Sequence, residues 1–232
     1  MANQSSSPVK RVTSKSEDTK PPVTRSKRIQ AKSTNRRQKQ KAALRRAILE
    51  AAEELFVEHG YENFSLRQVA EAIGYSPTTI YLHFSDKDEL LFHIVVEGFK
   101  NFGVALQAGY DSETDPMARL MAIGRAYLEF GLAHPVHYRL MFMQRGEFFL
   151  RPAPDNCEAP LDSFTVLTRT LEEGISAGKI KPGDITEYAN LVWMTIHGIV
   201  ALAISMPYLA DRTYAETTYT HYGNMLRQYL CT

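Results

Sequence analysis

The chain has 232 residues, of which 44% are hydrophobic, so it can bury the core of one or two domains. Its two cysteines, Cys157 and Cys231, have neither metal-binding nor redox spacing, and Cys231 lies beside the C-terminus. This disfavours a structural disulfide and favours a reducing, cytoplasmic setting. The charged, serine-rich N-terminus lacks the apolar segment of a signal peptide, so we expect none.

The net charge of +1 conceals a strong asymmetry. Residues 1–46 contain fourteen Lys or Arg and two Asp or Glu, whereas residues 47–232 contain thirteen and twenty-four. A basic segment joined to an acidic remainder is typical of a chain that meets a polyanion with one end.

The first predicted segment, residues 1–38, contains very few large apolar side chains and is predicted to be a disordered basic arm. The composition fits a solubilising tail. It also fits an arm that follows phosphates or enters a minor groove through Arg36 and Arg37. We expect non-specific electrostatic help in binding a polyanion.

Apolar residues at three- and four-residue spacing predict a first helix over about 37–58, with Gly60 just beyond its end. Ser65 and Gln68 form a capping box at the start of a second helix. The side chains predicted to be buried in these two helices are Ile48, Ala51, Ala52, Leu55, Phe56, Leu66, Val69, Ala70 and Ile73.

Gly74 then supplies a turn, Ser76 is a good N-cap, and Pro77 suits the first position of a third helix. That helix is predicted over about 77–84, with Ile80 and Phe84 facing inward. A long fourth helix is predicted from a cap at Ser85 to about residue 108.

Three short helices with a glycine turn between the second and third, followed by a long helix, predict a helix-turn-helix unit. The third helix begins with small side chains, Pro77, Thr78 and Thr79, which let a helix lie deep in a major groove. The free amides at its start attract phosphate. The sequence therefore indicates a DNA-binding end.

The remaining chain is also predicted to be helical, so the fold class is all-α. Asp115 begins one helix, His134 and Pro135 begin a short one, and Asp184 with Glu187 forms a further capping box. The predicted helices start near residues 115, 134, 161, 185 and 211, and residues 145–160 are predicted to form a loop. The sequence shows neither an internal repeat nor a convincing strand pattern.

Residues 188–210 contain no charged side chain and are long enough to span a bilayer. They include Asn190, Thr195, His197, Ser205 and Pro207, and no basic cluster flanks them. We therefore prefer a helix buried on two sides to a membrane span. Such a helix predicts a homodimer in which the last two helices pack against their copies.

The segment AILEAAEELFVEHGYENFSLRQVAEAIGYSPTTIYLHFSDKDELL, residues 47–91, resembles the DNA-binding domain of the TetR family of transcriptional regulators. After the disordered arm at 1–38 that the composition predicts, the resemblance implies a DNA-binding domain at 39–103 and an effector-binding and dimerisation domain at 104–232. It also implies an operator in double-stranded DNA, a small-molecule effector and a homodimer. It departs from the commonest family pattern at Leu82 and in its long basic arm.

The same resemblance assigns the DNA contacts. It places Ser65 and Arg67 on phosphates, Pro77, Thr78 and Thr79 facing bases, and three further side chains clamping phosphates, which are Tyr81, His83 and Lys87.

The stretch HPVHYRLMF and the later Trp193, His197 and Gly198 resemble one C-terminal subtype of the family, with a Trp and a His-Gly pair on the penultimate helix. Position and character give six candidates for the effector pocket: Tyr127, His137, Met141, Phe142, Trp193 and His197. Trp193 and His197 could instead be packed core. The spacing of His134 and His137 permits a shared metal, but a third ligand is not evident, so we expect neither metal nor cofactor.

We find no nucleophile elbow, phosphate loop or zinc-protease motif, so catalytic residues are not expected. The function predicted is a sequence-specific DNA-binding regulator, a repressor released from a palindromic operator by a small-molecule effector. The alternatives are a transcriptional activator, and a small-molecule-binding protein or enzyme with a vestigial DNA-binding unit.

Overall fold

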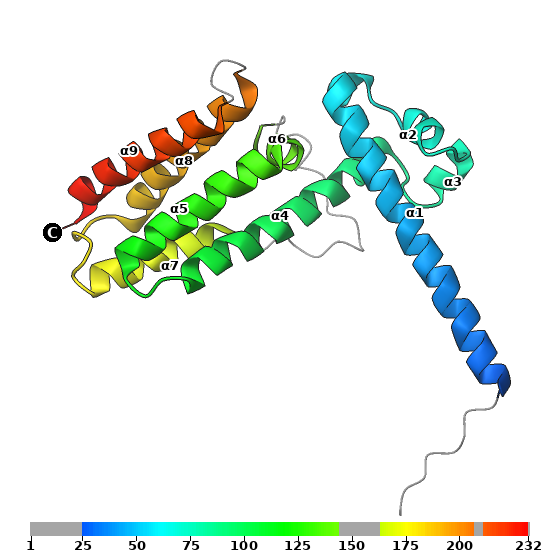
Figure 1. The fold of residues 1–232 in the computed structure, drawn as a ribbon, viewed down its shortest axis with the longest axis horizontal. Helices are drawn as coiled ribbons and strands as arrows, with labels where there is room; N and C mark the ends of the chain where they lie inside the picture. The colour runs from blue at the N-terminus through cyan, green and yellow to red at the C-terminus, as the bar shows by residue number, and fades with distance from the viewer. Residues whose placement is uncertain (1–24, 144–162, 207–210, 232) are drawn as a thin grey trace, which may run out of the picture. The chain divides into compact units, whose positions relative to one another are not determined.

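The computed structural model describes residues 25–143, 163–206 and 211–231, and these residues contain helices and no strand (Figure 1). The all-α prediction is confirmed. The helices are α1 (Arg25–Asn63), α2 (Leu66–Ala72), α3 (Pro77–Tyr81), α4 (Lys87–Asp111), α5 (Pro116–Ala133), α6 (Pro135–Phe142), α7 (Ser163–Ser176), α8 (Ile185–Ser205) and α9 (Arg212–Leu230).

The chain divides into two units, residues 1–44 and 45–232, which are described separately. In the first unit, α1 begins at Arg25, whereas the sequence predicted a disordered arm to residue 38. Residues 25–36 contain neither Gly nor Pro and several strong helix formers, so the backbone can be helical although residues 33–43 are all exposed. The prediction for residues 1–24 lies outside the described residues.

In the second unit, Gly60, with φ of 71°, interrupts the helical backbone of α1 shortly before the helix ends at Asn63. A positive φ favours glycine because it has no Cβ, and Gly74 provides the same conformation, with φ of 70°, between α2 and α3. The two glycines let the later part of α1 and the short helices α2 and α3 close around one small core, whose buried members include Ile48, Ala52, Phe56, Phe64, Val69, Ile80 and Phe84.

The N-terminus of α4 differs from the prediction. Its N-cap is Asp86, not Ser85, and the Asp86 carboxylate accepts a hydrogen bond from the Glu89 amide at 2.8 Å. Ser85 takes part differently, because its amide donates to Oε2 of Glu89 at 2.7 Å. Adjacent Ser and Asp residues are both good caps, and a one-residue shift decides between them.

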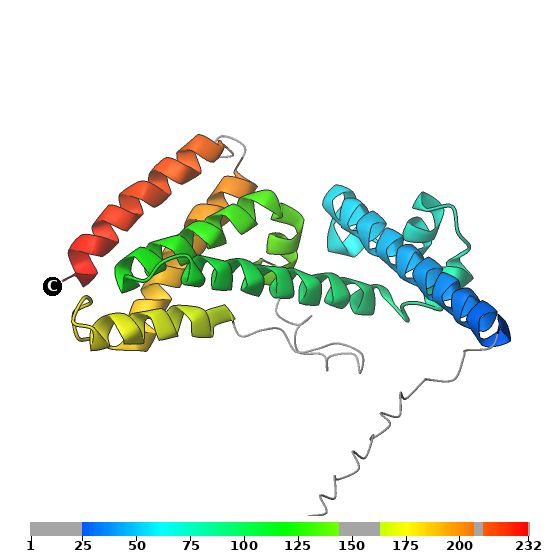
Figure 2. The ribbon, with the colours of Figure 1, turned by 60° about the horizontal axis from the view of Figure 1, so that its bottom comes forward.

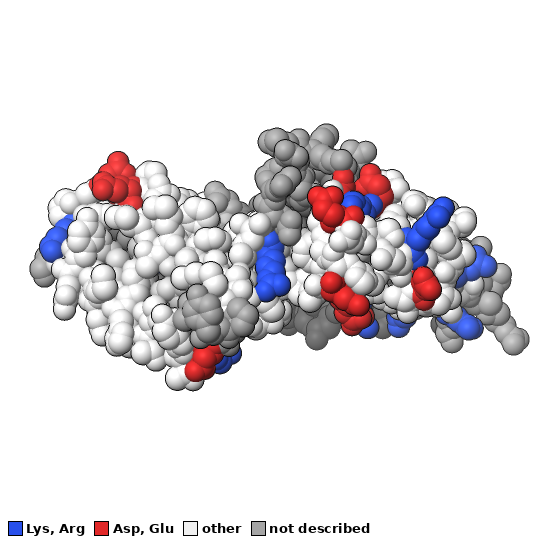
Figure 3. Space-filling view, turned by 90° about the horizontal axis from the view of Figure 1, so that it is seen from above, with Lys and Arg blue, Asp and Glu red and all other residues white. Residues whose placement is uncertain are grey.

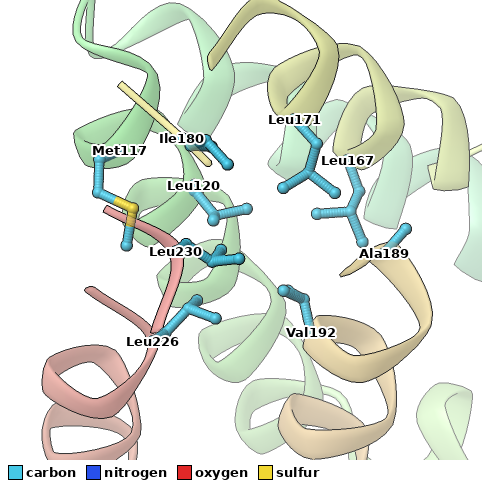
Figure 4. Close-up of a cluster of buried hydrophobic side chains, with 9 residues drawn as sticks. All are labelled: Met117, Leu120, Leu167, Leu171, Ile180, Ala189, Val192, Leu226 and Leu230. Carbon is cyan, nitrogen blue, oxygen red and sulfur yellow. The ribbon is translucent and has the colours of Figure 1, made fainter. Parts of the chain in front are cut away.

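Helices α4 and α5 lie side by side in both ribbon views (Figures 1 and 2). Gly109 permits their close approach, because a Cβ at this position would lie 2.9 Å from the carbonyl oxygen of Ala122. Near the start of α5, side chains from α5, α7, α8 and α9 point toward one another (Figure 4). Leu171, Ile180, Ala189 and Leu230 are the most deeply buried there.

The predicted starts of α5, α8 and α9 are confirmed by N-caps at Asp115, Asp184 and Asp211, each accepting backbone amide hydrogen bonds. The predicted loop at 145–160 and Pro207 lie outside the described residues.

Helix α8 is long and apolar enough to cross a membrane by length and composition, and about a third of its most apolar stretch is buried. Its exposed apolar side chains continue onto α9, and the surface over these two helices carries few charges (Figure 3). This apolar face consists of Leu191, Met194, Leu202 and Met206 on or next to α8, with Tyr214, Met225 and Tyr229 on α9.

Candidate DNA-binding surface and ligand cavity

The α2–α3 unit presents a polar surface over an apolar core. Ile80 and Phe84 are buried, whereas Pro77, Thr78 and Tyr81 are exposed and Thr79 is half-buried. Ser76 organises the start of α3, since its Oγ accepts from the Thr79 amide at 3.2 Å and lies 2.9 Å from Thr79 Oγ1. The side chains that the sequence predicted to face bases therefore lie together on the solvent side.

Ser65 holds the start of α2. Its Oγ donates to Oε1 of Gln68 at 2.7 Å and accepts from the Gln68 amide at 3.4 Å. The predicted capping box is therefore modified, because the Gln68 side chain bonds the cap hydroxyl. Arg67, two positions into the helix, is exposed and can reach a phosphate.

Lys87 is anchored within the domain. Its Nζ donates to the carbonyl oxygen of Tyr61 at 2.9 Å and lies 4.2 Å from the centroid of the Tyr61 ring. The Tyr61 hydroxyl in turn donates to Oδ1 of Asp88 at 2.5 Å. These contacts fix the first turn of α4 to the end of α1. His83 follows α3 in the sequence, before Lys87, and is half-buried.

The second feature is a cavity of about 340 Å³ among α4, α5, α6, α7 and α8. Its walls are almost entirely apolar and strongly aromatic. The lining residues are Phe99, Phe102 and Leu106 on α4, Leu120, Ile123, Gly124 and Tyr127 on α5, Phe142 on α6, Ser163, Phe164 and Leu167 on α7, and Val192, Trp193 and Ile196 on α8. This volume lies at the small end of ligand pockets.

A polar cluster lies behind one wall of the cavity. Oη of Tyr138 lies 2.6 Å from Nδ1 of His197, and Oη of Tyr127 lies 3.0 Å from Oη of Tyr138 and 3.3 Å from the same His197 nitrogen. Burial raises the pKa of Tyr127 to about 12 and raises that of Tyr138 further, while it lowers the pKa of His197. Low solvation thus favours the neutral form of all three groups.

The six effector-pocket candidates occupy different places. Tyr127, Phe142 and Trp193 line the cavity. His197 lies behind it, bonded to the two tyrosines, and Met141 packs where Gly98 leaves space on α4. His137 faces α1, where its Nε2 lies 3.5 Å from Oε1 of Glu53.

The His134 side chain makes no cap hydrogen bond at the start of α6. Its ring packs against Phe130 and His137, with centroids 5.0 and 5.9 Å apart. The described residues contain no group of three side chains that could hold a metal. Beside His197, a Cβ at Gly198 would meet no packing neighbour within 4 Å among the described residues.

Sequence reasoning did not select the aromatic residues that α4 and α7 contribute to the cavity. Phe99 and Phe102 lie three residues apart on α4, and Phe164 lies at the start of α7. The only signal was their helical spacing, which also describes ordinary core residues. Their convergence on one cavity depends on helix packing, which spacing along one helix does not specify.

Comparison with known proteins agrees with this architecture. Residues 48–94 match the family model for bacterial regulatory proteins of the tetR family, and residues 120–221 match the tetracyclin repressor-like C-terminal domain. The chain is 28% identical over 166 residues to the HTH-type transcriptional regulator RutR of Escherichia coli O157:H7, covering 70% of this chain and 76% of RutR.

Two further relatives extend the comparison. The HTH-type transcriptional repressor Rv1474c of Mycobacterium tuberculosis is 45% identical over 56 residues, which are 24% of this chain and 30% of that protein. A solved structure of a protein with unknown function from Rhodococcus sp. RHA1 is 30% identical, with a TM-score of 0.68, and covers 82% of this chain and 96% of that one.

A helix-turn-helix surface joined to a helical domain with an apolar cavity defines a ligand-responsive class of DNA-binding transcriptional regulators. With both of its parts matched, the chain belongs to the TetR family of transcriptional regulators.

Proposed function

We propose that this regulator is a cytoplasmic homodimeric repressor that leaves a palindromic operator when a small molecule enters the cavity. The observation that carries this proposal is the exposed, polar start of α3. Polar side chains on the surface of a helix can contact base edges, whereas side chains buried in a core cannot. The proposed domains are a DNA-binding domain at 39–103 and an effector-binding and dimerisation domain at 104–232. One relative, Rv1474c, is named a repressor and another, FasR of Mycolicibacterium smegmatis, is named an activator, so the reporter experiment below decides the sign of regulation.

For DNA recognition, we assign base contacts to Pro77, Thr78 and Thr79. Phosphate contacts are assigned to Ser65, Arg67, Tyr81, His83 and Lys87. Two copies of α3 related by a two-fold axis would enter successive major grooves about 34–36 Å apart. A symmetric protein therefore requires a symmetric operator.

Dimerisation is assigned to the apolar face of α8 and α9. Exposed patches of this kind mark interaction sites, and a two-fold dimer buries the same patch from both copies. Trp193, 36% exposed, lies on the other side of α8, where it lines the cavity and packs against Phe164 of α7. Helix α8 therefore carries the proposed interface on one side and a wall of the cavity on the other.

Effector binding is assigned to the cavity, and regulation follows from linkage. A ligand that binds better to the dimer geometry unsuited to DNA lowers operator affinity by the ratio of its two affinities. The mechanism needs no chemical step on the ligand, so we propose a regulator without enzymatic activity.

The test is selection of bound DNA from a random pool with the full-length chain, followed by a promoter reporter that carries the enriched site. A palindrome is expected, and expression of the protein should lower reporter output. Higher output would indicate an activator. A pool without enrichment would indicate a vestigial DNA-binding unit and would reject the proposal.

A further inference from the structure

Building on the proposed function, we propose that residues 33–43 of α1 form a second DNA-binding surface, which holds phosphates without reading the base sequence. We call this stretch the basic surface. Composition alone fits both a solubilising tail and a polyanion-binding arm. The choice of DNA rests on the exposure of the stretch, on the kinds of side chain in it, and on the arrangement of its cations around the helix.

The basic surface takes no part in a core. Residues 33–43 are helical, and all of them are exposed. The wider stretch 25–44 contains eight Lys or Arg and neither Asp nor Glu, so no carboxylate within it offsets the charge. Farther along α1, Arg46 pairs with Glu50 at 3.3 Å, but the described residues provide no ion pair for the four cations between residues 36 and 41. These cations are therefore available to an anion from outside the chain.

Every side chain from Ser33 to Lys41 is of a type that bonds phosphate oxygens. The stretch has the sequence STNRRQKQK, which contains only Ser, Thr, Asn, Gln, Lys and Arg. These residues supply most contacts to phosphate and sugar in protein–DNA complexes. A helix that lies on a lipid surface needs a broad apolar face, and a protein interface needs aromatic or apolar anchors. Residues 33–43 contain no apolar side chain larger than alanine, so DNA is the polyanion that suits them.

The four cations lie on two sides of the helix. Arg36 and Lys39 are three residues apart on one side, where they border a shallow hollow together with Asn35. Arg37 and Lys41 are four residues apart on nearly the opposite side. Like charges at these spacings destabilise an isolated helix. Because a DNA groove has phosphates along both of its edges, it can neutralise both pairs of cations at once.

The test compares variants of the full-length chain on the selected operator and on a scrambled duplex of the same length. Arg36→Gln/Arg37→Gln/Lys39→Gln/Lys41→Gln removes the four cations with a residue that favours helices equally well. We expect affinity for both duplexes at low salt to fall at least about tenfold. The slope of log K against log salt should fall by at least about 2, since each phosphate contact contributes about 0.9. The ratio of the two affinities should change less than about twofold, because phosphate contacts do not distinguish sequences.

The first control keeps the charge. Arg36→Lys/Arg37→Lys/Lys39→Arg/Lys41→Arg exchanges the two kinds of cation and should keep the native slope on both duplexes. The substituted side chains are exposed, so far-UV circular dichroism of both four-residue variants should match that of the native chain.

The second control removes charge elsewhere. Lys100→Gln/Lys179→Gln takes two exposed cations from outside α1 and should leave the slope unchanged. Arg36→Gln/Lys39→Gln removes the same number of charges from the basic surface and should lower the slope by at least about 1. This pair of variants separates the position of the charges from the net charge of the chain.

The proposal is overturned if the variant without the four cations keeps the native slope. It is also overturned if that variant loses its preference for the operator over the scrambled duplex, because the stretch would then read bases. Vesicles containing phosphatidylserine provide a further check. If the native chain binds them, the variant does not, and the slope on DNA is unchanged, the stretch binds a lipid surface instead.

The proposed function is tested separately, by the preference of the native chain for the selected palindrome. If that preference is found and the slopes of native and variant chains are equal, the second DNA-binding surface alone is rejected. If the native chain has no such preference but the slopes on the scrambled duplex differ as expected, the proposed function alone is rejected.

Discussion

His137 on α6 and Glu53 on α1 meet across the junction between the helical domain and the DNA-binding helices, with Nε2 of His137 3.5 Å from Oε1 of Glu53. Helix α6 also carries Phe142, which lines the cavity. Burial lowers the pKa of His137, and the nearby His134 lowers it further. Burial therefore opposes the charged form of His137 at this contact.

The first prediction concerns the pH dependence of stability at this contact. Burial, followed by repulsion from Glu97, Glu50 and Glu54, raises the pKa of Glu53 from 4.5 to about 7. The folded state thus holds a proton that the unfolded state releases, so the free energy of unfolding falls as pH rises from about 4.5 to 7. Glu53→Gln, which imitates the protonated form, should be nearly neutral at pH 4 and stabilising at pH 8.

The expected gain at pH 8, discounted for solvent screening, is about 1 kcal/mol, or a Tm rise of about 2–4 °C. Thermal unfolding across this pH range measures it. Glu62→Gln, at an exposed position of α1, is the control and should show no such trend. Equal effects of Glu53→Gln at pH 4 and pH 8 would contradict the prediction.

The second prediction distinguishes phosphate contacts, which position the protein on DNA, from base contacts, which recognise the sequence. Arg67→Ala should weaken binding to every sequence and reduce the slope of log K against log salt by about 0.9, the loss of one phosphate contact. Thr78→Ala should leave that slope unchanged. It should lower discrimination at one base pair by about 1 kcal/mol. Gel-shift titrations at several salt concentrations, on the selected operator and its single-base variants, measure both quantities.

Lys179→Ala is the matched control, since it removes an exposed cation far along the chain from the DNA-binding helices. It should change neither the slope nor the base preference. If Arg67→Ala and Lys179→Ala behaved identically, Arg67 on α2 would not contact the DNA phosphates.

Local chemistry explains what the sequence could predict. The caps Ser65, Ser76, Asp115 and Asp184 act on amides two or three residues away, so nearest neighbours determine them. The same locality explains the error at α4, where two adjacent capping residues compete. The early start at Arg25 was missed because helix formers without an apolar stripe leave no periodic signal.

Non-local chemistry explains what the sequence could not predict. Tyr138 and His197 are 59 positions apart, and their 2.6 Å contact depends on how α6 packs against α8. His137 and Trp193 were selected together as pocket candidates, yet one faces α1 and the other lines the cavity. Residue character indicates that an aromatic or a histidine will be buried, but helix rotation determines which neighbour it meets.

The third prediction tests the packing of α5 against α8. A Cβ on Gly131 would lie 2.3 Å from Cγ1 of Val200 and 3.1 Å from the Tyr138 ring. Gly131→Ala should therefore destabilise the fold by about 1–3 kcal/mol, because this core is overpacked by the added methyl group. Val200→Ala removes the clashing atom, so the double variant should lose less than the two single variants together in urea unfolding. Additive losses would show that the two positions are not in contact.

The last prediction concerns the apolar face of α8 and α9. Met194 is 56% exposed and Met225 is 67% exposed, and both belong to this face. If it is the dimer interface, Met194→Glu with Met225→Glu would bury four unpaired charges in the symmetric dimer, a cost large enough to separate the subunits. Light scattering at micromolar concentration should give twice 26.3 kDa for the native chain and 26.3 kDa for this variant. Val57→Glu, at a 53% exposed apolar residue of α1, is the control and should remain dimeric. A double variant that stays dimeric would place the interface elsewhere.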